Sequence, residues 1–569
     1  MVREKETFWQ GHNKKKQMKQ ATLLIIACFV VLGLQAQERS IILGGELSNS
    51  AVTSVEDVDK VIPRMKVLGL NTVLVPAYWE FIEPEEGRFD FSLIDHIIQR
   101  ARENDLKIVF LWFGAWKNSM SCYTPLWFKK NTKRFPRACT EEGKPLEIAS
   151  CFSKNVFQAD NRAFEMLIKH IVATGHDVVS MIQVENEIGM LESARDHSKI
   201  ADEIYKKGVP RDLVNYLKSH QEELHPWLKQ RLSLPLSSSP VITWKEMFGD
   251  DIYTDEIFMA YYYARYVGGL CETARKYTQI PLYVNAALNS RGRLPGQYPS
   301  AGPLAHLIDL WHAGAPQLEM LAPDIYDTGF KGWANQYALP NNRLFIPESR
   351  CCENSGVRAL YVFGEHDALG FSPFAIDEAS IQETQSVTQA YHIMRQLISM
   401  KANRKKPISQ SWGLLFDQQD KERIIKDGET MITCRHFFTL PWDSRATDGS
   451  IWPEGGAVLM KLTNDEYLLA GNGVVVSFAS EYEYQFLHEV ALGEDGFILK
   501  GGQNEKKSTN NFSFNGKRIG LGFVDEVKID QDGHIIYVRR HNGDQDHQGR
   551  HARISCGRWT ILHIKLYNF

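Results

Sequence analysis

Met181-Ile182-Gln183-Val184-Glu185-Asn186-Glu187-Ile188-Gly189 and Leu344-Phe345-Ile346-Pro347-Glu348-Ser349 are the two stretches that decide the predicted fold. Each is a short apolar run, typical of a buried β-strand, that leads into a glutamate. Similar runs alternate with amphipathic stretches from about residue 39 to residue 400, and this alternation predicts a parallel sheet. In a (β/α)8 barrel the C-terminal ends of the strands carry the active site, so both glutamates are expected at one rim.

The predicted barrel has a strand for each apolar run. Eight such strands favour a closed barrel over an open doubly wound sheet, which typically has fewer. A helix is expected after Ser92, with Ser92 and Asp95 as a capping box, and a long helix from about Asp377 to Met400 completes the barrel. The predicted strands are residues 41–46, 72–79, 107–112, 178–184, 281–285, 320–326, 344–347 and 359–364.

The pattern of apolar and polar residues changes after the basic stretch at residues 401–407. Short alternating runs follow, broken by the hairpin signals Asn464-Asp465, Gly471-Asn472-Gly473 and Asp532-Gly533. The chain is therefore expected to comprise a signal peptide (residues 1–36), a catalytic (β/α)8 barrel (37–402) and a smaller all-β, sandwich-like accessory domain (408–569).

The N-terminus predicts export. Four lysines between residues 14 and 19 precede an apolar run at 21–34, and Ala36-Gln37 offers a cleavage point. The run is too short for a stable membrane span, so a periplasmic or extracellular location is expected. A lipid anchor on Cys28 is the alternative. It ranks second because the sequence after Cys28 stays apolar, which argues against lipidation at that residue. Some of the other eight cysteines can pair in an exported protein.

Composition excludes several function classes. The 569-residue chain is 43% hydrophobic and 24% charged, as in ordinary globular proteins, and its net charge of −4 gives no sign of a nucleic-acid partner. Phosphate-loop, zincin and Cys-x-x-Cys patterns are absent, so neither a cofactor nor a metal is expected. The histidines at 541, 547 and 551, near Asp544 and Asp546, match no ligand spacing and read as a solvated loop.

Two carboxyl groups in different roles are the requirement of glycoside hydrolysis. Glu187 is the candidate general acid and then general base, and Glu348 is the candidate nucleophile. Asn186, beside Glu187, is expected to hydrogen-bond the sugar 2-hydroxyl. Tyr326 follows the sixth predicted strand and either orients Glu348 through its phenol or packs on a rim loop.

Other polar and aromatic residues at strand ends are candidate sugar contacts. Trp116 is the expected stacking surface for a pyranose, with Asn118 beside it. Glu46 and Glu80 either bind sugar hydroxyls or form barrel-top ion pairs. Glu185, which lies earlier on its strand, is expected in the barrel interior.

Several motifs resemble glycoside hydrolase family 35. The second-strand signature of that family is similar to residues 69–73 together with Trp79-Glu80-Phe81-Ile82-Glu83-Pro84-Glu85-Glu86-Gly87-Arg88-Phe89-Asp90-Phe91. Its acid/base segment resembles residues 183–189, and its nucleophile strand resembles residues 346–348. Residues 466–471 and 542–544 resemble the C-terminal β-domain of a bacterial branch. Pro76 stands where that family has a tyrosine, and residues 113–118 replace its Arg-Pro-Gly-Pro and Ala-Glu-Trp elements.

The resemblance implies a retaining, metal-free exo-β-galactosidase that removes terminal β-linked galactose from a plant-type polysaccharide or its oligosaccharides. An exo-β-glycosidase acting on another sugar, such as arabinopyranose, is the alternative within the class. A barrel that only binds carbohydrate is a third hypothesis, and the presence of both Glu187 and Glu348 argues against it.

Overall fold

The computed structural model describes residues 41–233, 241–404, 408, 410–440, 443–481, 483–484, 517–541 and 551–569. Residues 42–569 form one compact unit. The expected signal peptide and Cys28 lie outside the described residues, as do Asp544, Asp546 and His547.

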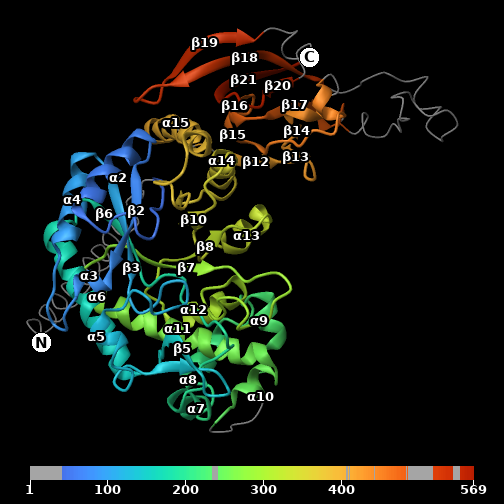
Figure 1. The fold of residues 1–569 in the computed structure, drawn as a ribbon. Helices are drawn as coiled ribbons and strands as arrows, with labels where there is room; N and C mark the ends of the chain where they lie inside the picture. The colour runs from blue at the N-terminus through green and yellow to red at the C-terminus, as the bar shows by residue number, and fades with distance from the viewer. Residues whose placement is uncertain are drawn as a thin grey trace, which may run out of the picture. The chain divides into compact units, whose positions relative to one another are not determined.

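The first part of this unit is a curled arrangement of parallel strands (Figure 1). Within the described residues, one sheet runs in the order β10-β8-β7-β6-β3-β2 and another in the order β1-β11-β9. The sheets join where Glu46 bridges Leu74 of β2, and where β9 continues into β10 across Pro347. The predicted (β/α)8 barrel is thus confirmed. Its strands are β1 (Ile42–Leu43), β2 (Thr72–Tyr78), β3 (Lys107–Phe113), β6 (Val179–Gln183), β7 (Leu282–Ala287), β8 (Met320–Ile325), β9 (Phe345–Ile346), β10 (Glu348–Ser349) and β11 (Gly370–Phe371).

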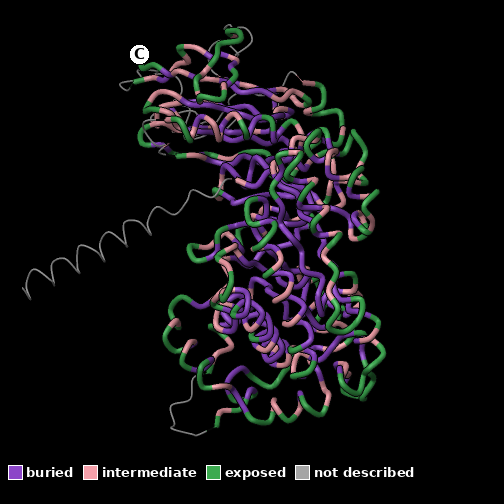
Figure 2. The backbone as a smooth tube through the Cα atoms, turned by 90° about the vertical axis from the view of Figure 1, so that its left-hand side faces the viewer, coloured by how far each residue is buried: buried purple, intermediate pink, exposed green. Residues whose placement is uncertain are grey.

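Helices cover the outside of the barrel, so its strands are buried on both faces (Figure 2). The main helices are α2 (Val55–Val67), α4 (Ser92–Glu103), α6 (Lys154–Thr174), α11 (Ile252–Ala274), α12 (Ile308–Gly314), α13 (Phe330–Tyr337), α14 (Ser355–His366) and α15 (Ile381–Asn403). Shorter elements in the connections are α3 (Trp79–Ile82), α5 (Leu126–Lys129), β4 (Arg137–Cys139), β5 (Pro145–Ala149), α7 (Lys199–Tyr205), α8 (Arg211–Ser219), α9 (Pro226–Arg231), α10 (Trp244–Phe248) and the 3-10 turn Ala305–Leu307.

The predicted eighth strand is wrong. Residues 359–364 lie in α14, and the eighth strand is the two-residue β11. A continuous apolar run fits a buried helix as well as a buried strand, and α14 is buried nearly all round because it lies between the barrel and the second domain. The long final helix was expected four residues too early: α15 begins after Ser380, which forms a capping box with Glu383.

Helix α4 begins at Ser92, but the expected capping box is wrong, because the N-cap residue is Phe91, whose side chain makes no capping hydrogen bond. Ser92 is its first helical residue rather than the residue that caps it. The side chain of Asp90 accepts the backbone N–H of Ser92 at 2.9 Å.

The C-terminal part is a β-sandwich. Within the described residues, a sheet of order β12-β15-β16-β21-β18-β19 faces a sheet of order β13-β14-β17-β20 across a common apolar core. The hairpins at Asn464-Asp465 and Asp532-Gly533 are confirmed, whereas Gly471–Gly473 carries the chain from one sheet to the other. The strands are β12 (Gln410–Phe416), β13 (Glu422–Asp427), β14 (Thr430–His436), β15 (Gly455–Thr463), β16 (Glu466–Asn472), β17 (Val474–Ser480), β18 (Ile519–Ile529), β19 (Ile535–His541), β20 (His551–Ile554) and β21 (Thr560–Asn568), with 3-10 turns at Phe437–Thr439 and Ser444–Ala446.

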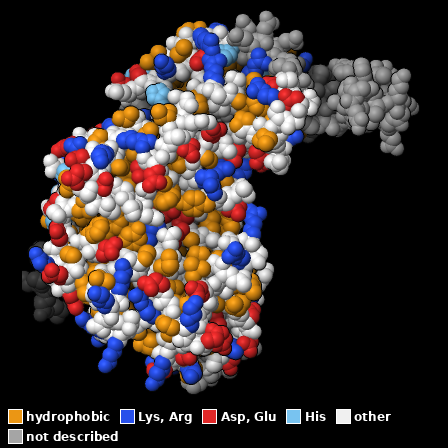
Figure 3. Space-filling model, viewed as in Figure 1, with side chains coloured by type: hydrophobic (Ala, Val, Ile, Leu, Met, Phe, Trp, Pro, Cys, Tyr) orange, Lys and Arg blue, Asp and Glu red, His pale blue; other side chains and the backbone are white. Residues whose placement is uncertain are grey.

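Cysteines and surface charge add little to the architecture. Among the described residues the cysteines are free, so the part of the chain that the structure covers holds no disulfide. On the face drawn in Figure 3, basic side chains are interspersed with acidic ones. The free cysteines are Cys122, Cys139, Cys151, Cys271, Cys351, Cys352, Cys434 and Cys556.

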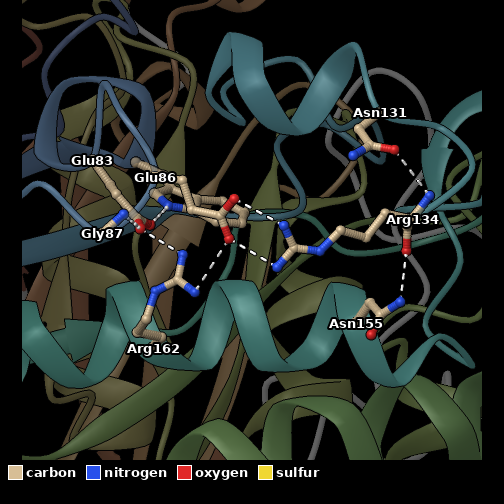
Figure 4. Close-up of polar contacts among 8 residues, drawn as sticks. Glu83, Glu86, Gly87, Asn131, Arg134, Asn155 and Arg162 are labelled. Atoms are coloured by element: carbon tan, nitrogen blue, oxygen red, sulfur yellow. Dashed lines mark hydrogen bonds and ion pairs between the residues drawn. The ribbon is translucent and has the colours of Figure 1, made fainter.

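The loop after β2 is fixed by ion pairs with α6 (Figure 4). The carboxylate of Glu83 is fully buried and accepts hydrogen bonds from Trp79 Nε1 at 2.9 Å, Gly87 N at 2.7 Å and Arg162 at 2.5 Å. Glu86 pairs with both guanidinium nitrogens of Arg134 at 2.8 Å. The acidic motif at 83–87 therefore serves structure, because it holds the rim next to β2 in one conformation.

Replacing Glu83 by alanine should destabilise the protein. Three donors, one of them a guanidinium, would lose their acceptor, and breaking a buried pair of this kind costs about 3 kcal/mol. Urea unfolding followed by tryptophan fluorescence measures the effect. Glu85→Ala is the matched control, because Glu85 is exposed and pairs with Arg88 at 3.4 Å, so its loss should cost under about 0.5 kcal/mol. Equal effects of the two substitutions would contradict this account of the loop.

Candidate active site

Glu187 and Glu348 lie together at the C-terminal ends of the barrel strands. Glu187 follows β6 and Glu348 opens β10, and their side chains are 7% and 3% exposed. Oxygen atoms of Glu187, Glu348 and Asp324 all lie within 4.8 Å of one another. The carboxyl groups of Glu187 and Glu348 are therefore close enough to contact the same bound group.

Three neutral donors hold the carboxylate of Glu348. Asn186 Nδ2 and Asn285 Nδ2 donate to Oε1 at 3.3 and 3.2 Å, and the Tyr326 hydroxyl donates to Oε2 at 2.8 Å. Burial, and next the charge of Glu348, raise the pKa of Tyr326, so its phenol keeps the proton that it donates. Tyr326 therefore has the orienting contact that the sequence suggested.

Glu187 has the electrostatics of a general acid. Burial, and after it the negative charge of Glu348, raise the pKa of Glu187 to about 7, while the charge of Lys117 acts in the opposite direction. The backbone at Glu187 is left-handed, with φ of 46°, and its N–H donates to Asn285 Oδ1 at 2.9 Å. A carboxylic acid that keeps its proton near neutral pH can protonate a leaving oxygen.

Two further carboxyl groups, Glu46 and Asp324, complete the cluster. Burial, and next the charge of Glu348, raise the pKa of both well above the usual range. The oxygens of Glu46 have no donor among the described side chains, yet the residue lies against Glu348, which fits a proton carried by Glu46 itself. Glu46 was expected to contact a sugar hydroxyl, and the structure places it in the same cluster as the two glutamates.

The site also contains four residues to which the sequence assigned no role: Asn285, Asp324, Lys117 and Ser119. Asn285 also donates to Asp324 Oδ2 at 2.8 Å, and Ser119 donates from both its N–H and its hydroxyl to the Glu187 carbonyl, at 3.0 and 2.9 Å. The available signal was a polar residue near the end of an otherwise apolar strand, as in Leu-Tyr-Val-Asn and Met-Leu-Ala-Pro-Asp.

Trp116 is not the expected sugar platform. Its side chain is fully buried and packs edge-on against Tyr263 and Tyr266, so neither ring face is open. Its backbone carbonyl accepts the N–H of Asn186 at 3.2 Å, and its N–H donates to Glu185 at 2.7 Å. Trp116 thus supports the segment that carries Asn186. Glu185 is buried beneath it, beside Asp160 of α6, and so faces the helices rather than the expected barrel interior.

Glu80 and Asn118 lie apart from the carboxyl cluster. Glu80 forms the ion pair with Lys129 at 3.7 Å that was its alternative interpretation, and it lines a separate cavity of about 330 Å³ with Tyr78 and Phe81. Asn118 is exposed at the tip of the turn between Lys117 and Met120, where its φ is 50°. The structure thus shows the ion pair of Glu80, the sugar contacts of Glu80 and Asn118 stay predictions, and Asn118 lies at the rim.

Residues 51–236 match a family model described as beta-galactosidase, glycoside hydrolase family 42. The match, over part of the barrel, is to a family of glycoside hydrolases, the class of enzyme that the two glutamates predicted. The expected membership of family 35 is wrong, because the matching family is 42. Residues 387–553 match a domain of unknown function, DUF5597. No curated protein matches the chain.

Solved structures of beta-galactosidases resemble the chain distantly. The enzyme from the psychrophilic Marinomonas ef1 is 14% identical, with a TM-score of 0.44 over 62% of this chain and 59% of that one. The enzyme from Bacillus circulans sp. alkalophilus is 14% identical, with a TM-score of 0.44 over 64% of this chain and 57% of that one. The enzyme from Rahnella sp. R3 is 15% identical, with a TM-score of 0.44 over 63% of this chain and 57% of that one. The chain spans less than two thirds of the length of each, so its chemistry rests on the family match and on the site.

Glu187→Gln should stabilise the protein only at higher pH. The pKa of Glu187 is about 7 in the folded protein against 4.5 for an ordinary glutamate, so its contribution to stability is present at pH 4 and is lost as pH rises through 7. The uncharged amide escapes this loss, and the gain at pH 8 should be on the order of 3 kcal/mol.

Urea unfolding at pH 4, 6 and 8 measures this difference, with Glu147→Gln as the control at an exposed carboxylate. A Glu187→Gln effect that does not change with pH would contradict the assigned pKa.

Proposed function

We propose that the chain is an exported, retaining exo-β-galactosidase that removes terminal β-linked galactose from oligosaccharides or polysaccharides. The observation that supports it most is the close approach of Glu187 and Glu348, with the pKa of Glu187 at about 7. One buried carboxyl group then carries a proton while its neighbour accepts three hydrogen bonds, which is the division of roles that double displacement needs.

In the first step Glu348 attacks the anomeric carbon while Glu187 gives its proton to the departing oxygen. The product is a glycosyl-enzyme ester on Glu348. Once Glu348 is esterified its negative charge is gone, so the pKa of Glu187 falls and it becomes a base. In the second step Glu187 takes a proton from water, which displaces the sugar and restores Glu348.

Asn186 is the proposed contact of the sugar 2-hydroxyl. Its Nδ2 already reaches Glu348, and its Oδ1 is buried without a partner among the described residues. A hydroxyl on the carbon next to the anomeric centre would supply the missing donor. A buried acceptor without a donor is costly, so this contact favours a bound sugar over an empty site.

Galactose is proposed from the family match, and a panel of aryl glycosides tests it. Nitrophenyl β-galactoside, α-L-arabinopyranoside and β-glucoside share one leaving group, so their kcat/KM values compare the sugars alone. The galactoside should be preferred. Preference for the arabinopyranoside would identify another exo-β-glycosidase, and inactivity on all three would favour a barrel that only binds carbohydrate.

Export is proposed from the sequence of residues 1–36, with lipidation of Cys28 as the alternative. Among the described residues, none of the helices has the length and apolar character needed to cross a membrane. Mass spectrometry of the N-terminus of the purified protein distinguishes cleavage after Ala36 from a lipidated Cys28.

Azide should distinguish the two glutamates. In Glu187→Ala the glycosyl-enzyme still forms from an activated aryl galactoside, but hydrolysis slows by about 10²–10⁴-fold for want of a base. Azide should then restore turnover and give the β-galactosyl azide. In Glu348→Ala attack on the sugar is lost, and azide can enter only from the opposite face to give the α-azide.

NMR of the two azide products determines their anomeric configuration. The same anomer from both variants would refute the assigned roles, even if both were inactive without azide.

Lys117→Met should move the alkaline limb of the pH–rate profile to higher pH. The positive charge of Lys117 lowers the pKa of Glu187, so its removal raises that pKa and lets the acid keep its proton further into the alkaline range. The profile of kcat/KM on the aryl galactoside measures the shift. Lys129→Met is the control, because Lys129 pairs with Glu80 outside the cluster. An unchanged or acid-shifted limb would exclude Glu187 as the titrating acid.

A further inference from the structure

A second cavity lies between the barrel and the β-sandwich. Its volume is about 610 Å³, within the usual range of small-molecule sites, and α14, α15 and the turn between β20 and β21 form its walls. Figure 1 shows α14 and α15 beside the strands of the sandwich, in agreement with the many contacts of α14 with β12 and β15.

One wall of this cavity carries a row of amides. Gln382, Gln385 and Gln389 follow one another at helical spacing on α15, so they share a face. Gln382 contacts Glu353, whereas within the described residues the side-chain amides of Gln385 and Gln389 have no hydrogen-bond partner. An amide offers both a donor and an acceptor, as a sugar hydroxyl does.

The facing wall carries Trp559. This side chain is half-buried, and it makes no contact with another ring or a cation among the described residues. A Cβ on Gly356 would lie 2.8 Å from the Trp559 ring and 2.2 Å from the Ser386 carbonyl, so the glycine permits both close approaches. A tryptophan ring that is partly accessible in a cavity can stack on the apolar side of a sugar ring.

Most of the charges around the cavity are paired, and Glu353 is a carboxylate that contacts only the amide of Gln382. Arg358 holds Glu454 through two hydrogen bonds, of 2.8 and 2.6 Å, and Arg558 is paired with Glu526. The cavity therefore offers amides, an aromatic surface and one carboxylate without a cation partner, so nothing in its lining attracts an anion. A neutral, hydroxyl-rich ligand fits this lining better than a phosphate or an acidic peptide.

Part of the cavity wall belongs to a loop at the catalytic end of the barrel. Glu353 and Asn354, in its wall, lie on the loop that joins β10 to α14, only a few residues after Glu348. Loops that follow parallel strands lie at the rim where Glu187 and Glu348 meet. A polymer bound here would therefore be kept on the side of the protein where its ends are cut.

We propose that this cavity is a non-catalytic binding site for a neutral polysaccharide, with Trp559 as the stacking platform and Gln385 and Gln389 as hydroxyl ligands. The proposal rests on the proposed function in one respect, that the ligand is a substrate polymer.

Affinity gel electrophoresis of the full chain tests the proposal. Native gels containing pectic galactan, arabinogalactan or xyloglucan are compared with a gel containing polygalacturonate, in a Glu348→Gln background that prevents degradation. We expect retardation by at least one neutral polymer. Trp559→Ala should weaken it about tenfold or more, as loss of a tryptophan anchor does. Gln385→Ala/Gln389→Ala, on an exposed helix face, should also weaken it, and Gln336→Ala on α13 should not.

The outcomes separate this site from the catalytic one. Absence of retardation in every neutral gel, retardation by polygalacturonate alone, or retardation that both cavity variants leave unchanged would overturn the proposal. Aryl-galactoside hydrolysis, measured with Glu348 restored, should change less than about twofold in the cavity variants, because a single sugar ring needs only the catalytic site. Failure of that hydrolysis in the wild type with retardation intact would refute the proposed function and leave the binding site standing.

Discussion

The repulsion among buried carboxyl groups is the constraint on which the site depends. Glu46, Glu187, Asp324 and Glu348 share one water-poor pocket with a single buried lysine, Lys117, within the described residues. Four negative charges cannot coexist there, so burial and the charge of Glu348 keep protons on the others. The raised pKa of Glu187 is thus a property of the cluster, and it changes whenever the charge on Glu348 changes.

A rigid rim holds this cluster in place. Asn285 bonds the Glu187 backbone, Asp324 and Glu348 at once, and Ser119 bonds the Glu187 carbonyl. The left-handed backbone at Glu187 is tolerated because these contacts over-determine it. On the neighbouring rim, the buried ion pairs of Glu83 with Arg162 fix the loop after β2. The hydrogen bonds around Glu187 and the ion pair of Glu83 both fix the positions of rim residues. A reaction between fixed carboxyl groups requires such positioning.

The β-sandwich extends the barrel's packing. Helix α14 is buried because barrel strands lie on one side of it and β12 and β15 on the other, and the Arg358–Glu454 and Arg423–Glu365 pairs lie across that interface. The helix that follows the Glu348 strand is therefore held by both domains, and the polar cavity beside it is a consequence of their packing. Neither domain alone would form that cavity.

Strand periodicity and acids at strand ends are local signals, so the barrel, the sandwich and the meeting of Glu187 and Glu348 could be predicted from the sequence. It also indicated Asn186 and Tyr326, which lie next to those strand ends. The other features of the fold and of the site depend on contacts between residues far apart in the sequence. The apolar run at 359–364 became a helix because it is covered on both sides, and Trp116 became core because Tyr263 and Tyr266 enclose it. Asn285 and Asp324 joined the site because neighbouring strands bring distant residues into register, and no local pattern records which strands are neighbours.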